Sequence, residues 1–375
     1  MSRVSFLVVL ICCILGSTSR AFAEPRDSLF YFGQDYGSES QFNPATALVN
    51  GGFDILRSYA YQDSLLHVDY KIGVQNVLTN IVHPADNLGK AGYVNVASHE
   101  IFPFRGLGTN YGQFVPNIFM HTFGEGMLYR KLEEWYEVQG VPYPRVASIL
   151  TTSAMQLLNE TVENGSFRGA NPDPIADMLI FNIMGFLLFS QDGIAGFFAD
   201  QVRIDYWPGQ AVIQPDTLRL VNMGENFAFK FKGLPWGVKL FGYIGNEGLG
   251  GLSIPLTSQD NFSFAYGLRV LRMSAIIGRN GDRLMVPSAG NNEWDLAMFW
   301  DRKDSLMASL ELGTVRDYSA LLNVYPGVIE WKGWTVGLYA KASHQDGVAA
   351  GLTFRHSPLG LGWGVGNDRA NAAFH

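Results

Sequence analysis

The chain has little cysteine, and the position of that cysteine is informative. Both cysteines are adjacent and lie inside the apolar run of residues 4–15. Arg3 precedes this run and Ala21-Phe22-Ala23 follows it, which is the order of charged region, apolar core and small-x-small cleavage site in a secretory signal peptide. We therefore expect residues 1–23 to be a signal peptide, and we expect the exported protein to have no disulfide and no lipid anchor.

Charge is also scarce. Charged side chains are 16% of the residues, whereas roughly 25% is usual in soluble proteins. The net charge of −7 is spread along the chain, and no cluster of Lys and Arg could follow a phosphate backbone, so no nucleic-acid partner is expected. Beyond the signal, no apolar stretch reaches the ~18 residues of a membrane-spanning helix. Low charge together with 13% aromatic residues indicates a large surface that does not face water.

The sequence lacks the familiar signatures of catalysis and cofactor binding. It contains no G-x-S-x-G elbow, no Walker loop, no H-E-x-x-H helix, no C-x-x-C pair and no G-x-G-x-x-G that opens a helix after a strand. We therefore expect no cofactor and no metal centre. Whether the protein is an enzyme stays open at this point.

The residues that are present divide the exported chain into two patterns, of which the first is helical. Residues 24–42 are expected to be a linker with a strand at 29–36. Residues 43–200 then have the periodicity of helices, interrupted by proline and glycine. We expect these helices near residues 44–60, 64–82, 84–101, 112–138, 145–163 and 174–199.

From residue 201 to residue 375 the period changes to two. Leu338 and Ala340 alternate with Gly337 and Tyr339, and similar runs of about ten residues are separated by turn residues. This pattern predicts an antiparallel β-barrel over residues 201–375, with about 12 strands and a range of 8–12.

Two features favour a membrane barrel over a soluble sandwich. All of the eight tryptophans except Trp135 lie beyond residue 200, mostly near the ends of runs, as in the aromatic girdles of membrane barrels. Gly360, Gly362 and Gly364 alternate with apolar residues, and glycine on an inward face lets another backbone come close. We expect that backbone to be helical and to come from residues 43–200. The predicted fold class is α+β, a barrel with a helical plug or cap.

Three residues of the helical half, two histidines and a glutamate, are candidates for catalysis or binding. His121 and Glu125 are four residues apart and so share one face of a helix. The pair could bind a metal or act as a general base, and a structural hydrogen bond is the favoured interpretation. His83, directly before Pro84, marks the junction of two helices, and a binding role there is the less favoured alternative.

The most distinctive segment joins an acidic helix end to an acidic helix start. Glu160 and Glu163 end one helix, and Asp173, before Pro174, caps the next helix, which also carries Asp177. Inside a barrel these carboxylates need partners. A network between plug and wall is favoured over catalysis, with cations drawn from Arg203, Arg219, Lys230, Lys239 and Arg269. The catalytic candidates under the alternative are His121, Glu125, Glu160 and Glu163, and the binding candidates are Asp173, Asp177 and His83.

Several short motifs point to one family. They are Val82-His83-Pro84, Gly92-Tyr93, Ala97-Ser98, the helix end with Glu160 and Glu163, and residues 172–177 followed by Gly185. Together they resemble an uncharacterised family of bacterial outer-membrane proteins that join a helical region to a carboxyl-terminal barrel. The resemblance implies this architecture and location and transfers no activity.

These patterns predict a protein of the Gram-negative outer membrane, in contact with outer-membrane lipid. The favoured function is non-enzymatic: binding or transport of a lipid or apolar molecule, or scaffolding of the envelope. The alternative is a membrane-embedded hydrolase that acts on lipid or on an envelope polymer. Such an enzyme should bring a nucleophile or metal ligands together with a base in an accessible cavity.

Overall fold

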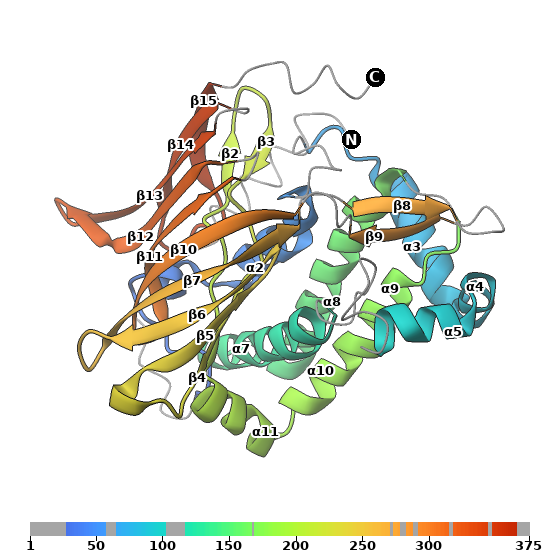
Figure 1. The fold of residues 1–375 in the computed structure, drawn as a ribbon, viewed down its shortest axis with the longest axis horizontal. Coiled ribbons are helices and arrows are strands. Elements are labelled where there is room, and N and C mark those ends of the chain that lie inside the picture. The colour runs from blue at the N-terminus through green and yellow to red at the C-terminus, as the bar shows by residue number, and fades with distance from the viewer. Residues whose placement is uncertain are drawn as a thin grey trace.

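The computed structural model describes residues 28–57, 65–102, 117–166, 169–270, 273–277, 283–287, 292–314, 318–343 and 347–365. These residues form a helical region and a large curved sheet that lie side by side (Figure 1). The fold class is therefore α+β, as the two periodicities predicted. The expected signal peptide, residues 1–23, lies outside the described residues.

The helices begin where capping residues predict them. The Asn43 side chain accepts a hydrogen bond from the Thr46 N–H at 3.0 Å, and Asp69 accepts one from the Ile72 N–H in the same way. The helical elements are η1 (Ser38–Gln41), α2 (Pro44–Gly52), η2 (Asp54–Arg57), α3 (Tyr70–Val82), α4 (Pro84–Ala91), α5 (Tyr93–Val96), η3 (Ala97–Ile101), η4 (Asn117–Gly124), α7 (Glu125–Val138), α8 (Pro144–Glu163), η5 (Asn164–Ser166), α9 (Asp173–Ala176), η6 (Asp177–Phe181), α10 (Asn182–Phe189), α11 (Asp192–Phe197), η7 (Phe198–Val202) and, between two strands, η8 (Pro235–Gly237).

A membrane-spanning helix needs sufficient length and apolar composition, and the described helices differ in how far they meet these requirements. No single one of them is long and apolar enough to cross a membrane, and one pair, Asp173–Phe189 with Asp192–Val202, meets the length and composition criteria together across an 86° bend.

The strands follow the change of period at residue 201. They are β1 (Ile204–Tyr206), β2 (Val212–Gln214), β3 (Arg219–Val221), β4 (Phe227–Phe231), β5 (Lys239–Ile244), β6 (Glu247–Pro255), β7 (Asp260–Val270), β8 (Met273–Ile277), β9 (Arg283–Pro287), β10 (Asn292–Arg302), β11 (Ser305–Gly313), β12 (Ala320–Trp331), β13 (Trp334–Ser343), β14 (Gly347–Phe354) and β15 (Gly360–Val365). Strands β8 and β9 pair with each other, and the others form one 13-stranded sheet.

The strand order is β1-β4-β5-β6-β7-β10-β11-β12-β13-β14-β15-β2-β3, antiparallel except for the parallel pair β15 and β2. Strands β1 and β3 are the edges, so the described strands do not close into the barrel that the sequence predicted. The two edges of the sheet nevertheless lie near each other, because only residues 207–211 separate β1 from β2, the neighbour of the edge strand β3. Such a segment spans about 20 Å at most, which requires a strongly curved sheet.

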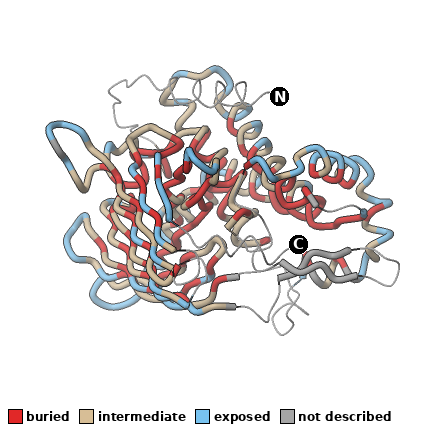
Figure 2. The backbone as a smooth tube through the Cα atoms, turned by 90° about the horizontal axis from the view of Figure 1, so that it is seen from above, coloured by how far each residue is buried: buried red, intermediate tan, exposed pale blue. Residues whose placement is uncertain are grey.

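Buried and exposed positions alternate along the strands (Figure 2). In β14, Val348 and Leu352 are exposed, whereas Gly351 and Thr353 are buried. Leu352 therefore points outward, as the alternation predicted. The buried side of the sheet carries both aromatic and charged residues, among them Phe299, Tyr325 and Lys230.

The inward glycines do admit another backbone, but not a helical one. A Cβ atom on Gly351 or Gly362 would lie 2.9 Å or less from a methyl carbon of Val212 in β2. Gln210, just before β2, donates hydrogen bonds to the carbonyl oxygens of Val324 and Leu338. The prediction of a helical partner was therefore wrong at this place. The segment that fills the concave side here belongs to the sheet itself.

Two further expectations need correction. Residues 29–36 form no strand; instead the Glu134 carboxylate on α7 accepts the backbone N–H groups of Leu29, Phe30 and Tyr31. Trp207 does not belong to a surface girdle, because it is fully buried against Phe241 and Phe299. The segment 29–31 is thus held by a helix, and Trp207 belongs to the apolar interior of the sheet. Alternation alone reveals neither contact.

A continuous apolar core joins the two regions. Met127, Leu128 and Leu132 of α7 and Met155 of α8 pack in one cluster with Phe227 and Phe229 of β4. Because these side chains are fully or nearly fully buried, the position of α7 and α8 relative to the sheet is fixed by apolar packing. Three of the functional side chains described next, Glu125, Glu160 and Glu163, lie on these two helices.

Candidate functional site

A buried acidic cluster occupies the helical region, built from four separate segments. Glu160 and Glu163 lie on the last turn of α8, Asp173 and Asp177 on α9 and η6, His121 and Glu125 where η4 passes into α7, and Glu100 on η3. All six carboxylates are 7% exposed or less. The cluster therefore unites the His121 and Glu125 pair with the acidic helix end and helix start, which the sequence proposed separately, and it adds Glu100.

Three of its segments have π-helical turns, and each carries one member: Glu100 on η3, His121 on η4 and Asp177 on η6. A π turn is wider than an α turn and is frequent at functional sites, because it changes the direction of side chains relative to the rest of the helix. Asp173 is the first residue of α9, with Pro172 at the cap position. Asp173 is therefore not the N-cap that the sequence predicted, and no described backbone N–H of the first turn donates to its carboxylate, which leaves that carboxylate available to the cluster.

The tightest group consists of Glu160, Glu163 and Asp173. One carboxylate oxygen of each lies within 4.8 Å of the others. His121 stands beside this group between two further acids: its Nδ1 is 2.7 Å from Glu125 Oε1, and its Nε2 is 3.3 Å from Asp177 Oδ2. The favoured interpretation of His121 and Glu125, a hydrogen-bonded pair, agrees with this geometry.

Asparagine side chains hold parts of the cluster in place. Asn164 donates to Glu160 Oε2 at 3.2 Å and itself accepts a hydrogen bond from Asn171 at 2.9 Å. Asn80 on α3 accepts from the Asn171 backbone N–H at 2.9 Å, and Asn117 donates to Glu100 Oε2 at 3.1 Å. Sequence reasoning missed these residues, since a single asparagine in a helix or loop carries no signal of its tertiary partner.

The electrostatics of the cluster favour protons or cations. Burial and the neighbouring carboxylates raise the pKa of Glu100 to about 8, and burial raises the pKa of Asp173 to about 6. The pKa values of Glu160, Glu163 and Asp177 are well above the ordinary range for the same two reasons. Burial works against a charged His121, but Glu125 outweighs it and raises the pKa of the imidazole. The site therefore attracts positive charge.

Four of the five cations that were expected from the strands have other described partners. Lys230 pairs with Asp301 and Asp304 at 2.9 Å, and Arg203 also pairs with Asp304. Lys239 donates to Asn261, and the Arg269 guanidinium lies over the Tyr318 ring. Within the part of the chain that the structure describes, His121 is the one cationic side chain in an ion pair with the acidic cluster. In the described part of the chain, the predicted plug-to-wall network thus does not join Arg203, Lys230 or Lys239 to the acidic cluster.

His83 is placed away from this chemistry. It is exposed at the junction of α3 and α4, where it ends one helix and precedes Pro84 at the start of the next. Its backbone carbonyl accepts a hydrogen bond from the Asn87 side chain. This position is that of a turn between two helices, the interpretation that the sequence favoured.

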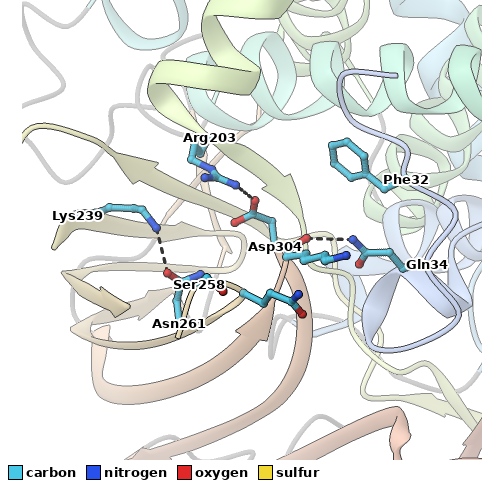
Figure 3. A pocket seen from close by; sticks show the side chains of 9 residues that line it. Phe32, Gln34, Arg203, Lys239, Ser258, Asn261 and Asp304 are labelled. Atoms are coloured by element: carbon cyan, nitrogen blue, oxygen red, sulfur yellow. Dashed lines mark hydrogen bonds and ion pairs between the residues drawn. The ribbon is translucent and has the colours of Figure 1, made fainter. Parts of the chain in front are cut away.

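A second polar feature is a cavity of about 370 Å³ near one end of the sheet. In Figure 3, Arg203, Lys239 and Asn261 line it from one side and Phe32 and Gln34 from the other, with Asp304 between them. The Gln34 side chain donates to the Lys303 carbonyl oxygen at 3.2 Å. This cavity combines an aromatic ring with three cationic side chains, those of Arg203, Lys239 and Lys303. Its lining could take an anionic group that carries an apolar part.

Comparison with known proteins adds no relative: no protein-family model, no curated protein and no solved structure matches the chain. The resemblance to an outer-membrane family therefore stays a prediction, and the functional argument rests on the geometry alone.

Proposed function

We propose that this protein resides in the outer membrane and that the convex side of its sheet contacts lipid. Its function under this proposal is non-enzymatic: it binds or transports a lipid or apolar molecule, or it scaffolds the envelope. The observation that supports the location is the inverted polarity of the sheet. Soluble antiparallel sheets direct apolar residues inward and polar residues to water. In this sheet, apolar residues are exposed and many charged residues are buried.

The register makes this polarity continuous from strand to strand. One outward row crosses the sheet from β5 to β15, and every member is apolar: Leu240, Leu252, Phe264, Met298, Leu310, Leu322, Ala340, Ala350 and Trp363. The inward positions include Glu247, Asp295 and Glu311, all buried. A continuous apolar face of this kind exceeds the scattered exposed residues that are normal on soluble proteins, and it matches the lipid face of a membrane sheet.

Aromatic side chains near the strand ends support the same location. Tyr266 and Trp294 are exposed on neighbouring strands and stack with their ring centroids 4.8 Å apart. Trp236 and Trp334, at two turns of the sheet, are 93% and 69% exposed. Exposed tryptophan and tyrosine are enriched at the two interfaces of a bilayer. We propose that the curved sheet is the wall of a barrel, with the helical region as its plug or cap.

The cavity of Figure 3 supports a binding role. Its aromatic ring, Phe32, and its cations, such as Lys239 and Lys303, together suit an amphiphile with an anionic headgroup. A hydrolase is the second candidate, and one observation favours it. His121 bridges Glu125 and Asp177 beside three clustered carboxylates, an arrangement that could serve a general base. Under that candidate, His121→Ala should leave the protein folded and change the envelope lipids seen by mass spectrometry.

The location is tested by Leu322→Arg, with Leu150→Arg as its matched control. Leu322 lies in the outward row and is 39% exposed, while Leu150 lies on α8 and is 65% exposed. If the row faces lipid, arginine at Leu322 should cost about 2 to 4 kcal/mol, whereas arginine at Leu150 should be tolerated. The measurements are recovery in outer-membrane fractions and heat-modifiable migration on gels. Equal tolerance of both variants, or recovery of the parent protein in the soluble fraction, would contradict the proposal.

A further inference from the structure

The acidic cluster has an excess of negative charge that its described neighbours do not balance. Six buried carboxylates, on Glu100, Glu125, Glu160, Glu163, Asp173 and Asp177, surround a single cationic side chain, His121. Buried charges in proteins are paired, protonated or bound to a metal. The convergence of Glu160, Glu163 and Asp173, with oxygens within 4.8 Å, marks the place where a counter-charge would be most strongly held.

A second observation comes from the hydrogen bonds that are missing. The Glu163 side chain is 6% exposed and forms no hydrogen bond or ion pair with any other described residue, and its Oε1 is buried without a partner. Asp177, 5% exposed, also has one buried oxygen, Oδ1, without a partner. Leaving such an acceptor unsatisfied is costly, and nearly all buried polar groups in proteins have partners. The unpartnered Glu163 oxygen belongs to the same three-residue group.

The ligand chemistry selects the kind of cation. The three converging donors are all carboxylate oxygens, which suit hard ions such as Ca²⁺, Mg²⁺ and Mn²⁺, whereas thiolate or several imidazole ligands would favour zinc or copper. The donors come from the end of α8 and the start of α9, two elements that the asparagine contacts of Asn164 and Asn171 hold together. A cation there would tie these two helix ends to each other.

We propose that Glu160, Glu163 and Asp173 bind one hard divalent cation, with Asp177 and His121 beside it as outer partners. This inference does not depend on the membrane location, because the site lies wholly within the helical region. It changes the expectation from the sequence, which predicted no metal centre.

The test uses the purified full chain, freed of metal with a chelator and titrated with Mn²⁺. Free Mn²⁺ is followed by electron paramagnetic resonance, and thermal unfolding is recorded with and without Mn²⁺. We expect saturable binding of one ion per chain, displaced by Ca²⁺, and a higher unfolding temperature with the ion bound. Glu163→Gln and Asp173→Asn should each weaken binding by at least ~10-fold, since even changes of outer partners cost about that much.

Two control variants separate a metal site from a structural network. Glu137→Gln removes an exposed acid of α7, and Glu311→Gln removes a buried acid of β11; both should bind Mn²⁺ like the parent. Without metal, Glu163→Gln should be at least as stable as the parent, because burial and Asp173 disfavour the ionised form of Glu163. Mn²⁺ should no longer stabilise this variant. Absence of saturable binding by the parent, or unchanged binding by both Glu163→Gln and Asp173→Asn, would overturn the proposal.

Discussion

Replacing Lys230 with methionine tests how the concave side of the sheet holds charge. Lys230 is fully buried on β4, and its Nζ lies 2.9 Å from Asp301 Oδ2 and 2.9 Å from Asp304 Oδ1. The same nitrogen lies 4.7 Å from the centroid of the Trp207 ring. Methionine keeps an unbranched apolar stem and removes the charge. The substitution therefore isolates the electrostatic part of these contacts.

The expected loss of unfolding free energy depends on which partners Asp301 and Asp304 keep in the Lys230→Met variant. Asp301, fully buried, would keep one hydrogen bond from Asn261 at 2.9 Å, and Asp304 would keep its ion pair with Arg203. Breaking a buried ion pair by removing one partner costs about 3 to 5 kcal/mol of unfolding free energy. Because Arg203 still neutralises Asp304, we expect a loss in the lower part of this range.

The assay is unfolding by denaturant in detergent, followed by tryptophan fluorescence. Lys232→Met is the matched control: Lys232 follows β4 and pairs with Asp200, and their side chains are 39% and 68% exposed, so its removal should change little. Adding Asp301→Asn to Lys230→Met removes the orphaned charge and should recover part of the loss. Equal stability of Lys230→Met and Lys232→Met would refute the claim that the buried ion pairs of Lys230 stabilise the protein.

Two further predictions concern close packing and acid stability. Gly362→Val should destabilise the protein by about 1 to 3 kcal/mol, because its Cβ would overlap a Val212 methyl group, whereas Gly250→Ala, with open space at the Cβ, should unfold at nearly the parent's denaturant midpoint. Burial raises the pKa of Asp304, but Lys230 and Arg203 outweigh burial and hold it below its usual 3.8. A carboxylate whose pKa is lowered by folding stabilises the protein above its usual pKa, and this stabilisation is lost as the pH falls below that value. Asp304→Asn should therefore be less stable than the parent at neutral pH, and its unfolding free energy should decrease less between about pH 5 and pH 2. Parallel acid-unfolding curves of the two proteins would contradict this expectation.

Much of the fold could be predicted because it depends on local rules. Asn43 and Asp69 cap helices through contacts three residues away, and the alternation of Leu352 with Gly351 and Thr353 needs only the pleat of a strand. Strand order is not local. The pairing of β15 with β2 joins residues far apart in the chain, and β2 is only three residues long, too short to produce a periodic signal.

The candidate site divides in the same way. His121 and Glu125 share a helical face, so their contact could be predicted from a spacing of four residues. Glu100 joins the cluster only through the packing of η3 beside α9, and the sequence carried no sign of that contact. Lys230 and Arg203, which the sequence offered as partners of the cluster, instead pair with Asp301 and Asp304 of the sheet.

The acidic cluster and the buried ion pairs of the sheet differ in kind. In the sheet, Lys230 and Arg203 meet acids of opposite charge, and Arg57 contacts Glu247 at 2.6 Å. In such pairs the two charges compensate each other, which is what a structural interior requires. In the helical region, Glu160, Glu163 and Asp173 repel one another, and Glu163 makes no hydrogen bond to the other described residues. A cluster of one charge sign is stable only with added protons or a bound cation, and this requirement is what distinguishes the acidic cluster from the ion pairs of the sheet.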